Sequence, residues 1–212
     1  MDPRVLSPLD RLLELAETGL RSSFARVPGR RPTPGKPAAT PLDPAARRHA
    51  AALMRVNHAG EIAAQGLYRG QALTARSPET RAALEKAAAE EGDHLAWCRE
   101  RLDELGSRPS LLDPLWFAGS VAIGALAGLA GDRASLGFMA ETERQVEGHL
   151  ADHLGRLPAD DERSRTIVQQ MQADEIAHGR AAVAAGGADL PPPVPRLMRL
   201  TARVMTGTAY WI

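Results

Sequence analysis

The sequence predicts an all-helical protein whose core is a four-helix bundle. Alanine and the aliphatic residues dominate a hydrophobic content of 44%, whereas aromatic residues make up only 4%. Such a composition favours helices over a β-sandwich. Apolar residues recur at spacings of three and four along four long segments, as they do on the buried face of a helix. No segment shows a convincing alternation of apolar and polar residues, which is typical of a strand.

Capping residues and glycines delimit the predicted helices. Three helix starts combine a capping residue with a proline at the first helical position, namely Asp43-Pro44, Ser77-Pro78 and Asp113-Pro114. Gly106, a break near Gly131 and the Gly186-Gly187 pair are expected to end helices. The bundle helices are therefore predicted at residues 44–75, 78–105, 114–155 with that break, and 160–185, the last of them starting near Pro158 to Glu162.

The connections between these helices predict how the bundle is wired. Only a few residues join the first helix to the second and the third to the fourth, so each pair should form an antiparallel hairpin. A long stretch after Gly106 separates the two pairs and itself contains an apolar helix. Two hairpins joined by one long crossover form a ferritin-like bundle, to which we assign residues 44–190.

Two further segments flank the bundle. Residues 1–43 combine a short amphipathic segment with a proline-rich linker, which covers residues 27–44. Residues 191–212 contain the joint PPPVP and a helix from about Arg196 to Thr206. After Asp189 this piece has arginines, no acid and an aromatic end, which suits an anionic membrane surface. We expect a membrane-associating helix packed on the bundle, and a purely docked helix is the alternative.

Charge and cysteine content narrow the function classes. Lys+Arg equal Asp+Glu at 26 each, so no net charge indicates a nucleic-acid partner. The single cysteine, Cys98, rules out an internal disulfide and fits a reducing compartment, where we interpret it as a buried thiol. We find neither a secretory signal nor a run of ~20 apolar residues. Residues 114–131 are uncharged but short, so we expect them to lie in a membrane interface, with a buried crossover helix as the alternative.

Two Glu-x-x-His pairs carry the chemistry that the sequence indicates. Glu91 with His94, and Glu175 with His178, fall on the apolar stripes of the second and fourth predicted helices. Three residues are close to one helical turn, so both side chains of a pair can reach one point. A carboxylate in a dry interior is costly unless something pairs with it. Glu90 lies instead on a face shared with other charged residues, which we expect to be solvated.

Each predicted hairpin adds one more glutamate from its first helix. Glu61 precedes Glu91 by 30 residues, and Glu143 precedes Glu175 by 32. Four carboxylates and two imidazoles on four facing helices are the ligand set of di-iron or di-manganese proteins. Two divalent cations cancel the charge of the four glutamates, and oxygen-rich ligation suits iron or manganese. One Glu-x-x-His pair could arise by chance, but two pairs with upstream glutamates disfavour an ordinary bundle with surface acids.

Several neighbouring residues remain as alternatives or as supporting groups. Periodicity prefers Glu143 to Glu147, and Asp174 is a weaker rival of the ligands on its helix. His58, Tyr68 and His149 lie on or near the ligand faces and are candidates to hydrogen-bond a metal ligand without binding the metal themselves. For the two histidines a purely structural role is the more common alternative.

Three other polar residues are expected at the surface. Asp93 and Arg101 share the face of Glu90, and His153 also fits a surface position.

Five motifs, in the same order, closely resemble the demethoxyubiquinone hydroxylase family of ubiquinone biosynthesis: MRVNHAGEIAAQGLYRGQ (54–71), EEGDHLAWC (90–98), DPLWFAGSVAIGALAGLAGD (113–132), AETERQVEGHL (140–150) and ADEIAH (173–178). The resemblance spans residues 43–212. Carried over by position, it implies metal ligands at Glu61, Glu91, His94, Glu143, Glu175 and His178, and so favours Glu143 over Glu147.

The resemblance implies a monooxygenase with two Fe ions that hydroxylates the ring of a polyprenyl 3-methyl-6-methoxy-1,4-benzoquinol with O2, the penultimate step towards ubiquinol. It also implies NADH or another reductant, and partner proteins of ubiquinone biosynthesis. We expect a peripheral protein on the cytoplasmic side of the cell membrane. An iron-storage bundle like ferritin is the alternative. The sequence leaves open the prenyl length and the oligomeric state, a homo-oligomer included.

Overall fold

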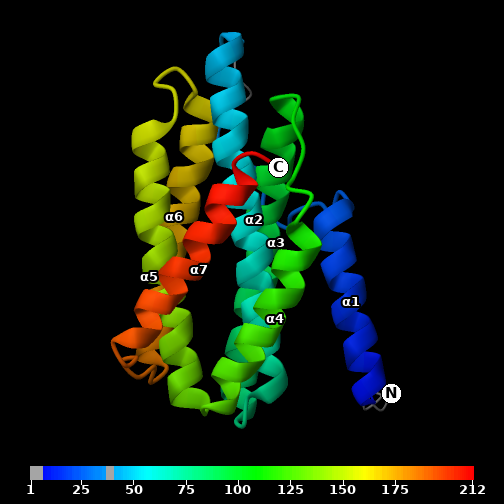
Figure 1. Cartoon of the computed structure of the whole chain (residues 1–212), viewed down its shortest axis with the longest axis vertical. Coiled ribbons are helices and arrows are strands. Elements are labelled where there is room, and N and C mark those ends of the chain that lie inside the picture. Colours follow the sequence, from blue (N-terminus) through cyan, green and yellow to red (C-terminus); the bar gives the residue numbers. More distant parts are fainter. Residues whose placement is uncertain (1–6, 37–40) are drawn as a thin grey trace.

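The computed structural model describes residues 7–36 and 41–212, and every regular element in this part of the chain is a helix. The fold prediction of an all-α protein is therefore confirmed. Seven helices follow one another along the described chain (Figure 1): α1 (Pro8–Phe24), α2 (Pro44–Thr74), α3 (Pro78–Glu104), α4 (Asp113–Leu129), α5 (Asp132–Arg156), α6 (Glu162–Ala184) and α7 (Pro193–Ala209).

The bundle has the ferritin-like wiring that the connection lengths predict. The hairpins α2–α3 and α5–α6 pack against each other through contacts of α3 with α6 and of α2 with α5. Helix α4 is the crossover that connects the two hairpins, and it runs along α2 (Figure 1). A buried apolar cluster fills the bundle towards one end, and it includes Leu53, Met54, Trp97, Leu102, Ile167 and Met171.

The helix ends follow local chemistry with one exception. The carboxylate of Asp43 accepts hydrogen bonds from the first backbone amides of α2, and Ser77 Oγ accepts from Thr80 N in α3. Gly131 separates α4 from α5 with a φ of 103°, which favours glycine. The prediction that Asp113 caps α4 was wrong, because Asp113 is fully buried and its carboxylate faces His58 of α2 instead.

Helix α4 packs against α2 through glycines, which explains its abundance of small residues. A β-carbon on Gly70 would lie 2.1 Å from Val121 O, and one on Gly124 would lie 2.1 Å from Leu67 O. The two backbones are thus in direct contact, while Leu115 and Leu126 remain exposed. One face of the predicted interfacial segment is therefore buried in the protein and another is free. Within the described residues, no helix combines the length and apolarity needed to cross a bilayer.

The segment expected to be a proline-rich linker is partly a structured arm, which we define as residues 25–36. It follows α1 and lies against α3, where the buried carboxylate of Asp93 accepts a hydrogen bond from Arg30 N at 2.5 Å. Residues 37–40 of the predicted linker lie outside the described residues. Asp93 and Arg101 were wrongly predicted to be solvated, since the arm covers Asp93 and Asp161 pairs with Arg101 at 2.8 Å.

Helix α7 crosses α5 and α2 near the C-terminal end of the chain (Figure 1). It begins at Pro193, three residues before the predicted start, because proline is tolerated in the first helical turn. Ala209 is buried at its end, and the hydroxyl of Tyr210 lies 2.8 Å from His49 Nδ1. Leu197, Leu200 and Val204 remain exposed along the helix.

Candidate metal centre

The structure brings the six predicted ligands together in the middle of the bundle. Glu61 comes from α2, Glu91 and His94 from α3, Glu143 from α5, and Glu175 and His178 from α6. They form two groups, each with four ligand atoms within 4.8 Å of one another: Glu61, Glu91, His94 and Glu175 in the first, and Glu91, Glu143, Glu175 and His178 in the second. The carboxylates of Glu91 and Glu175 belong to both groups, so the cluster offers two adjacent positions joined by two shared glutamates.

Both histidines direct Nδ1 into the cluster. His94 Nδ1 lies 3.0 Å from Glu175 and 3.2 Å from Glu91. His178 Nδ1 lies 3.4 Å from Glu175 and 3.6 Å from Glu91. The imidazoles therefore approach the two shared carboxylates from opposite sides, one for each position.

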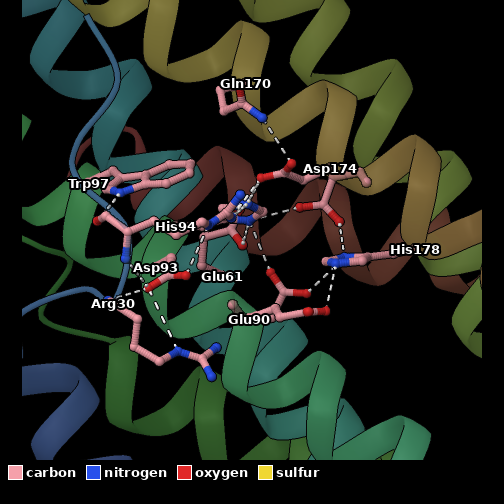
Figure 2. Close-up of polar contacts among 12 residues, drawn as sticks. Arg30, Glu61, Glu90, Asp93, His94, Trp97, Gln170, Asp174 and His178 are labelled. Carbon is pink, nitrogen blue, oxygen red and sulfur yellow. Dashed lines mark hydrogen bonds and ion pairs between the residues drawn. The ribbon is translucent and has the colours of Figure 1, made fainter.

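The outer nitrogen of each histidine faces a further carboxylate, which comes from the opposite helix. His94 Nε2 lies 2.9 Å from Asp174 of α6, and His178 Nε2 lies 3.1 Å from Glu90 of α3 (Figure 2). An ionised carboxylate can only accept a hydrogen bond, so in the neutral imidazole Nε2 carries the hydrogen and Nδ1 keeps a free lone pair. This arrangement prepares both Nδ1 atoms to bind a metal.

Sequence reasoning missed these roles of Glu90 and Asp174. Glu90 was expected to be solvated, but it is only partly exposed and reaches His178. Asp174 was considered as a rival ligand, yet it lies on the outer side of His94 (Figure 2). The signal was present in the sequence, because an acid directly precedes the glutamate of each Glu-x-x-His pair.

Unpaired buried atoms at the centre of the cluster fit a metal pair. Six of them have no hydrogen-bond partner: Glu91 Oε1 and Oε2, Glu175 Oε1 and Oε2, His94 Nδ1 and His178 Nδ1. A buried polar atom without a partner costs about 1–3 kcal/mol, so a native cluster of this kind needs something to satisfy it. These atoms belong to the two four-ligand groups, each of which offers three carboxylate oxygens and one imidazole nitrogen, and such a ligand set suits iron or manganese.

The electrostatics of the cluster also call for positive charge. Burial, together with the Glu175 carboxylate, raises the pKa of Glu91 well above its usual value. Burial and the same carboxylate raise the pKa of Glu143 as well. Burial alone would lower the pKa of His94, but the surrounding carboxylates, Asp174 first, raise it well above normal. The cluster therefore retains protons that metal binding would displace.

The three candidate supporting residues lie in different surroundings. The hydroxyl of Tyr68 donates a hydrogen bond to Glu143, and burial together with this carboxylate raises the pKa of Tyr68. His58 lies with Nδ1 3.0 Å from Asp113 Oδ2. The ring of His149 lies beside that of His153, with the centroids 4.0 Å apart. Among the described residues, Tyr68 is the one of the three that hydrogen-bonds a cluster member.

The histidine pair on α5 corrects one sequence expectation. His153 was expected at the surface, but only 1% of it is exposed. Burial, followed by the neighbouring His149, lowers the pKa of His153 to about 2. The His153 ring is therefore neutral at physiological pH.

Comparisons with known proteins show the family to which the chain belongs. The family model described as "Ubiquinone biosynthesis protein COQ7" matches residues 48–209. A protein of Polynucleobacter necessarius subsp. necessarius is 56% identical over 209 residues, which cover 98% of this chain and 100% of the relative. One from Burkholderia ambifaria is 57% identical over 206 residues, or 96% and 99% of the two chains.

A third relative, from Cupriavidus metallidurans, is 55% identical over 207 residues, covering 96% of this chain and 100% of its own. All three relatives are named 3-demethoxyubiquinol 3-hydroxylase. The helical wiring, the buried carboxylate–histidine cluster and these matches lead to one assignment. The chain is a member of the COQ7 family of ubiquinone biosynthesis proteins.

Proposed function

We propose that the chain is a 3-demethoxyubiquinol 3-hydroxylase, which hydroxylates the ring of a polyprenyl 3-methyl-6-methoxy-1,4-benzoquinol with O2. Similarity to proteins of that name over nearly the whole chain supports the reaction. The observation that carries the metal assignment is the pair of four-ligand groups that share Glu91 and Glu175. The iron-storage alternative is not favoured, since these relatives are named as hydroxylases.

We infer that two irons are held by Glu61, Glu91, His94, Glu143, Glu175 and His178. When bound, they would supply the activation of dioxygen, from which one oxygen atom enters the ring and the other leaves as water. That balance needs two electrons and two protons, for which we propose NADH or another reductant as the source. The chain itself provides charge, geometry and a dry interior.

The protein's own residues have separate tasks in this proposal. Glu91 and Glu175 keep the two metal positions adjacent because each carboxylate can serve both. Asp174 and Glu90 fix the orientation of the two imidazoles through Nε2. The Tyr68 hydroxyl binds one oxygen of Glu143 and limits the rotation of that carboxylate. Burial of all four glutamates excludes bulk water from the reacting oxygen.

We propose that the protein works on the cytoplasmic surface of the cell membrane, where its polyprenyl substrate resides. Three helices expose apolar side chains that support this location: Leu9, Leu13, Leu20 and Phe24 on α1, Leu115, Leu126 and Leu129 on α4, and Leu197, Leu200 and Val204 on α7. Trp211 after α7 is 80% exposed. Exposed leucines with aromatic and arginine neighbours suit the boundary between headgroups and acyl chains.

The catalytic proposal is tested with iron-loaded protein, a demethoxyubiquinol and a reductant under air. We expect about two irons per chain and oxygen-dependent formation of the hydroxylated quinol. Glu175→Ala should lose turnover and most of the bound iron, since it removes a ligand of both positions. Glu85→Ala, an exposed glutamate of the same bundle, is the matched control and should keep both. Normal turnover and iron content in Glu175→Ala would remove this residue from the centre.

The membrane proposal has its own experiment. The wild-type protein should co-float with vesicles that contain anionic lipid, and a variant with Leu197→Ser and Leu200→Ser should remain in the lower fractions. Both leucines are exposed, so the variant should melt at the wild-type temperature. If a triple variant that also carries Leu126→Ser on α4 floated as well as the wild type, the exposed faces of α4 and α7 would be ruled out as the membrane contact.

A further inference from the structure

The arm of residues 25–36 is fixed to α3 beside the candidate metal centre. Asp93, which is only 3% exposed, accepts a hydrogen bond from Arg30 N (Figure 2). The same side chain lies 3.0 Å from Arg31 Nε. Trp97 Nε1 donates to Arg31 O at 3.3 Å, and the Arg31 guanidinium lies 4.6 Å from the Trp97 ring centroid. These contacts hold the backbone and the guanidinium of Arg31 in one place.

From this position Arg31 reaches the carboxylate that orients His94. Arg31 Nη2 lies 2.8 Å from Asp174 Oδ2, the same oxygen that lies 2.9 Å from His94 Nε2. Gln170 Nε2 donates to the other oxygen of Asp174 at 2.9 Å (Figure 2). Asp174 is thus held by donors from three elements, and the arm supplies the charged one. No comparable arm contact is recorded for Glu90 within the described residues, where Lys86 of the same helix lies 3.6 Å away.

The charge balance of the metal centre also indicates that Arg31 neutralises Asp174. Two divalent cations would balance the four glutamates of the cluster, but Asp174 adds a further negative charge at its edge. The Arg31 guanidinium is the cation paired with that carboxylate. Without it, only His94 and Gln170 would hold Asp174, and its side chain, which is 17% exposed, could turn towards solvent. The imidazole of His94 would then lose its fixed acceptor.

We propose that Arg31 is a positioning residue of the metal centre, which acts through Asp174 to present His94 Nδ1 to the position formed with Glu61, Glu91 and Glu175. The inference rests on the proposed metal centre, though not on the hydroxylation reaction. The arm precedes residues 48–209, which match the family model, so this contribution comes from outside the matched segment. It makes the two metal positions unequal, because the arm supports only the one that contains His94.

The structure therefore assigns a selective effect to the loss of Arg31. Groups that orient a ligand histidine typically change metal affinity 10–100-fold when they are removed. Arg31→Gln should weaken one of the two metal equivalents by about this factor and leave the other unchanged. Arg31→Lys should weaken it less, because a lysine keeps the positive charge. Some weakening should remain, since an ammonium cannot bind Asp93 and Asp174 at once as the planar guanidinium does.

The test is a Co(II) titration of the metal-free full-length protein, followed by visible absorption, with thermal melts of each variant as a check on folding. Arg30→Gln is the matched control, since Arg30 lies on the same arm but its side chain reaches Ala89 O and, at 4.0 Å, Asp93 Oδ1, and does not contact Asp174. Asp174→Asn and the double variant Arg31→Gln/Asp174→Asn complete a double-mutant cycle. If Arg31 acts through Asp174, Arg31→Gln should have no further effect in the Asp174→Asn background.

The outcomes separate this inference from the proposed function. Wild-type binding of two equivalents with one weakened selectively in Arg31→Gln supports it. Unchanged binding in Arg31→Gln, equal weakening of both equivalents, or additive effects in the double variant overturn it while leaving the metal centre intact. A wild-type protein that fails to bind two equivalents overturns the metal centre and this inference together.

Discussion

Replacing Gly124 by alanine should drive α4 away from α2, and the structure allows the cost to be worked out. The new β-carbon would lie 2.1 Å from Leu67 O, where ordinary contact begins at 3.4 Å. The clashing atom is a backbone oxygen and not the end of a flexible side chain, so the two helices themselves must separate by about an ångström. Overpacking of a tight contact costs about 1–3 kcal/mol, and a clash with backbone belongs at the upper end.

For a chain of this size, each kcal/mol moves the melting temperature by about 2–4 °C. Gly124→Ala should therefore melt about 6–12 °C below the wild type. Gly119→Ala is the matched control in the same helix, because a β-carbon there meets nothing within 4 Å. A helical glycine replaced by alanine without a clash gains about 0.5–1 kcal/mol, so this variant should melt slightly higher.

The melting temperatures of the wild type and both variants are measured by calorimetry at equal metal loading. The reasoning is refuted if Gly124→Ala melts within about 2 °C of the wild type, or if Gly119→Ala is destabilised to the same extent. Either result would mean that the close approach of α2 and α4 is not maintained in solution.

Three further predictions concern buried groups. Because burial raises the pKa values of Glu91 and Glu143, the native metal-free protein keeps protons that the unfolded chain releases above pH 4.5, and these two groups should make the free energy of unfolding fall as pH rises from there towards the raised values. Melts in chelator should therefore show a more negative pH dependence for the wild type than for a Glu91→Gln/Glu143→Gln variant, and identical pH profiles would contradict this. Asp113→Ala should lower the free energy of unfolding by about 1–3 kcal/mol in denaturant melts, since it leaves the buried His58 Nδ1 without its carboxylate, and an unchanged midpoint would exclude that role. Cys98 should not react with a thiol reagent in the native protein but should react once per chain in denaturant, because burial raises the pKa of its thiol.

The sequence predicts the bundle and the meeting of the six candidate ligands because both depend on local periodicity. Glu91 and His94 share a stripe with apolar neighbours, and any helix that buries the stripe must bury them. Capping at Asp43 and Ser77 is equally local and was predicted at the correct residues. Asp113 has the same sequence signature, yet its carboxylate pairs with a histidine of another helix, a choice that only tertiary packing makes.

Contacts between distant segments account for the remaining differences. The helical periodicity places Glu90 on a face with other charged residues. Its partner His178 can be identified only once α3 and α6 are placed side by side. The proline-rich composition of residues 27–36 correctly excludes a helix but carries no information on what the segment touches. Its attachment depends on the buried Asp93 and on Trp97, which lie more than 60 residues further along the chain. Composition alone could not have connected them.

Helices α3 and α6 each supply the carboxylate that contacts the histidine of the other, and this arrangement has a consequence for how the protein matures. The Nε2 atom of each histidine contacts a carboxylate from the other hairpin, so neither hairpin alone can orient its own histidine for metal binding. During synthesis, α3 leaves the ribosome well before α6, and in that interval it lacks both its acceptor and half of the shared oxygens. Cofactor insertion should therefore come late, after the polypeptide has been released and its halves have joined.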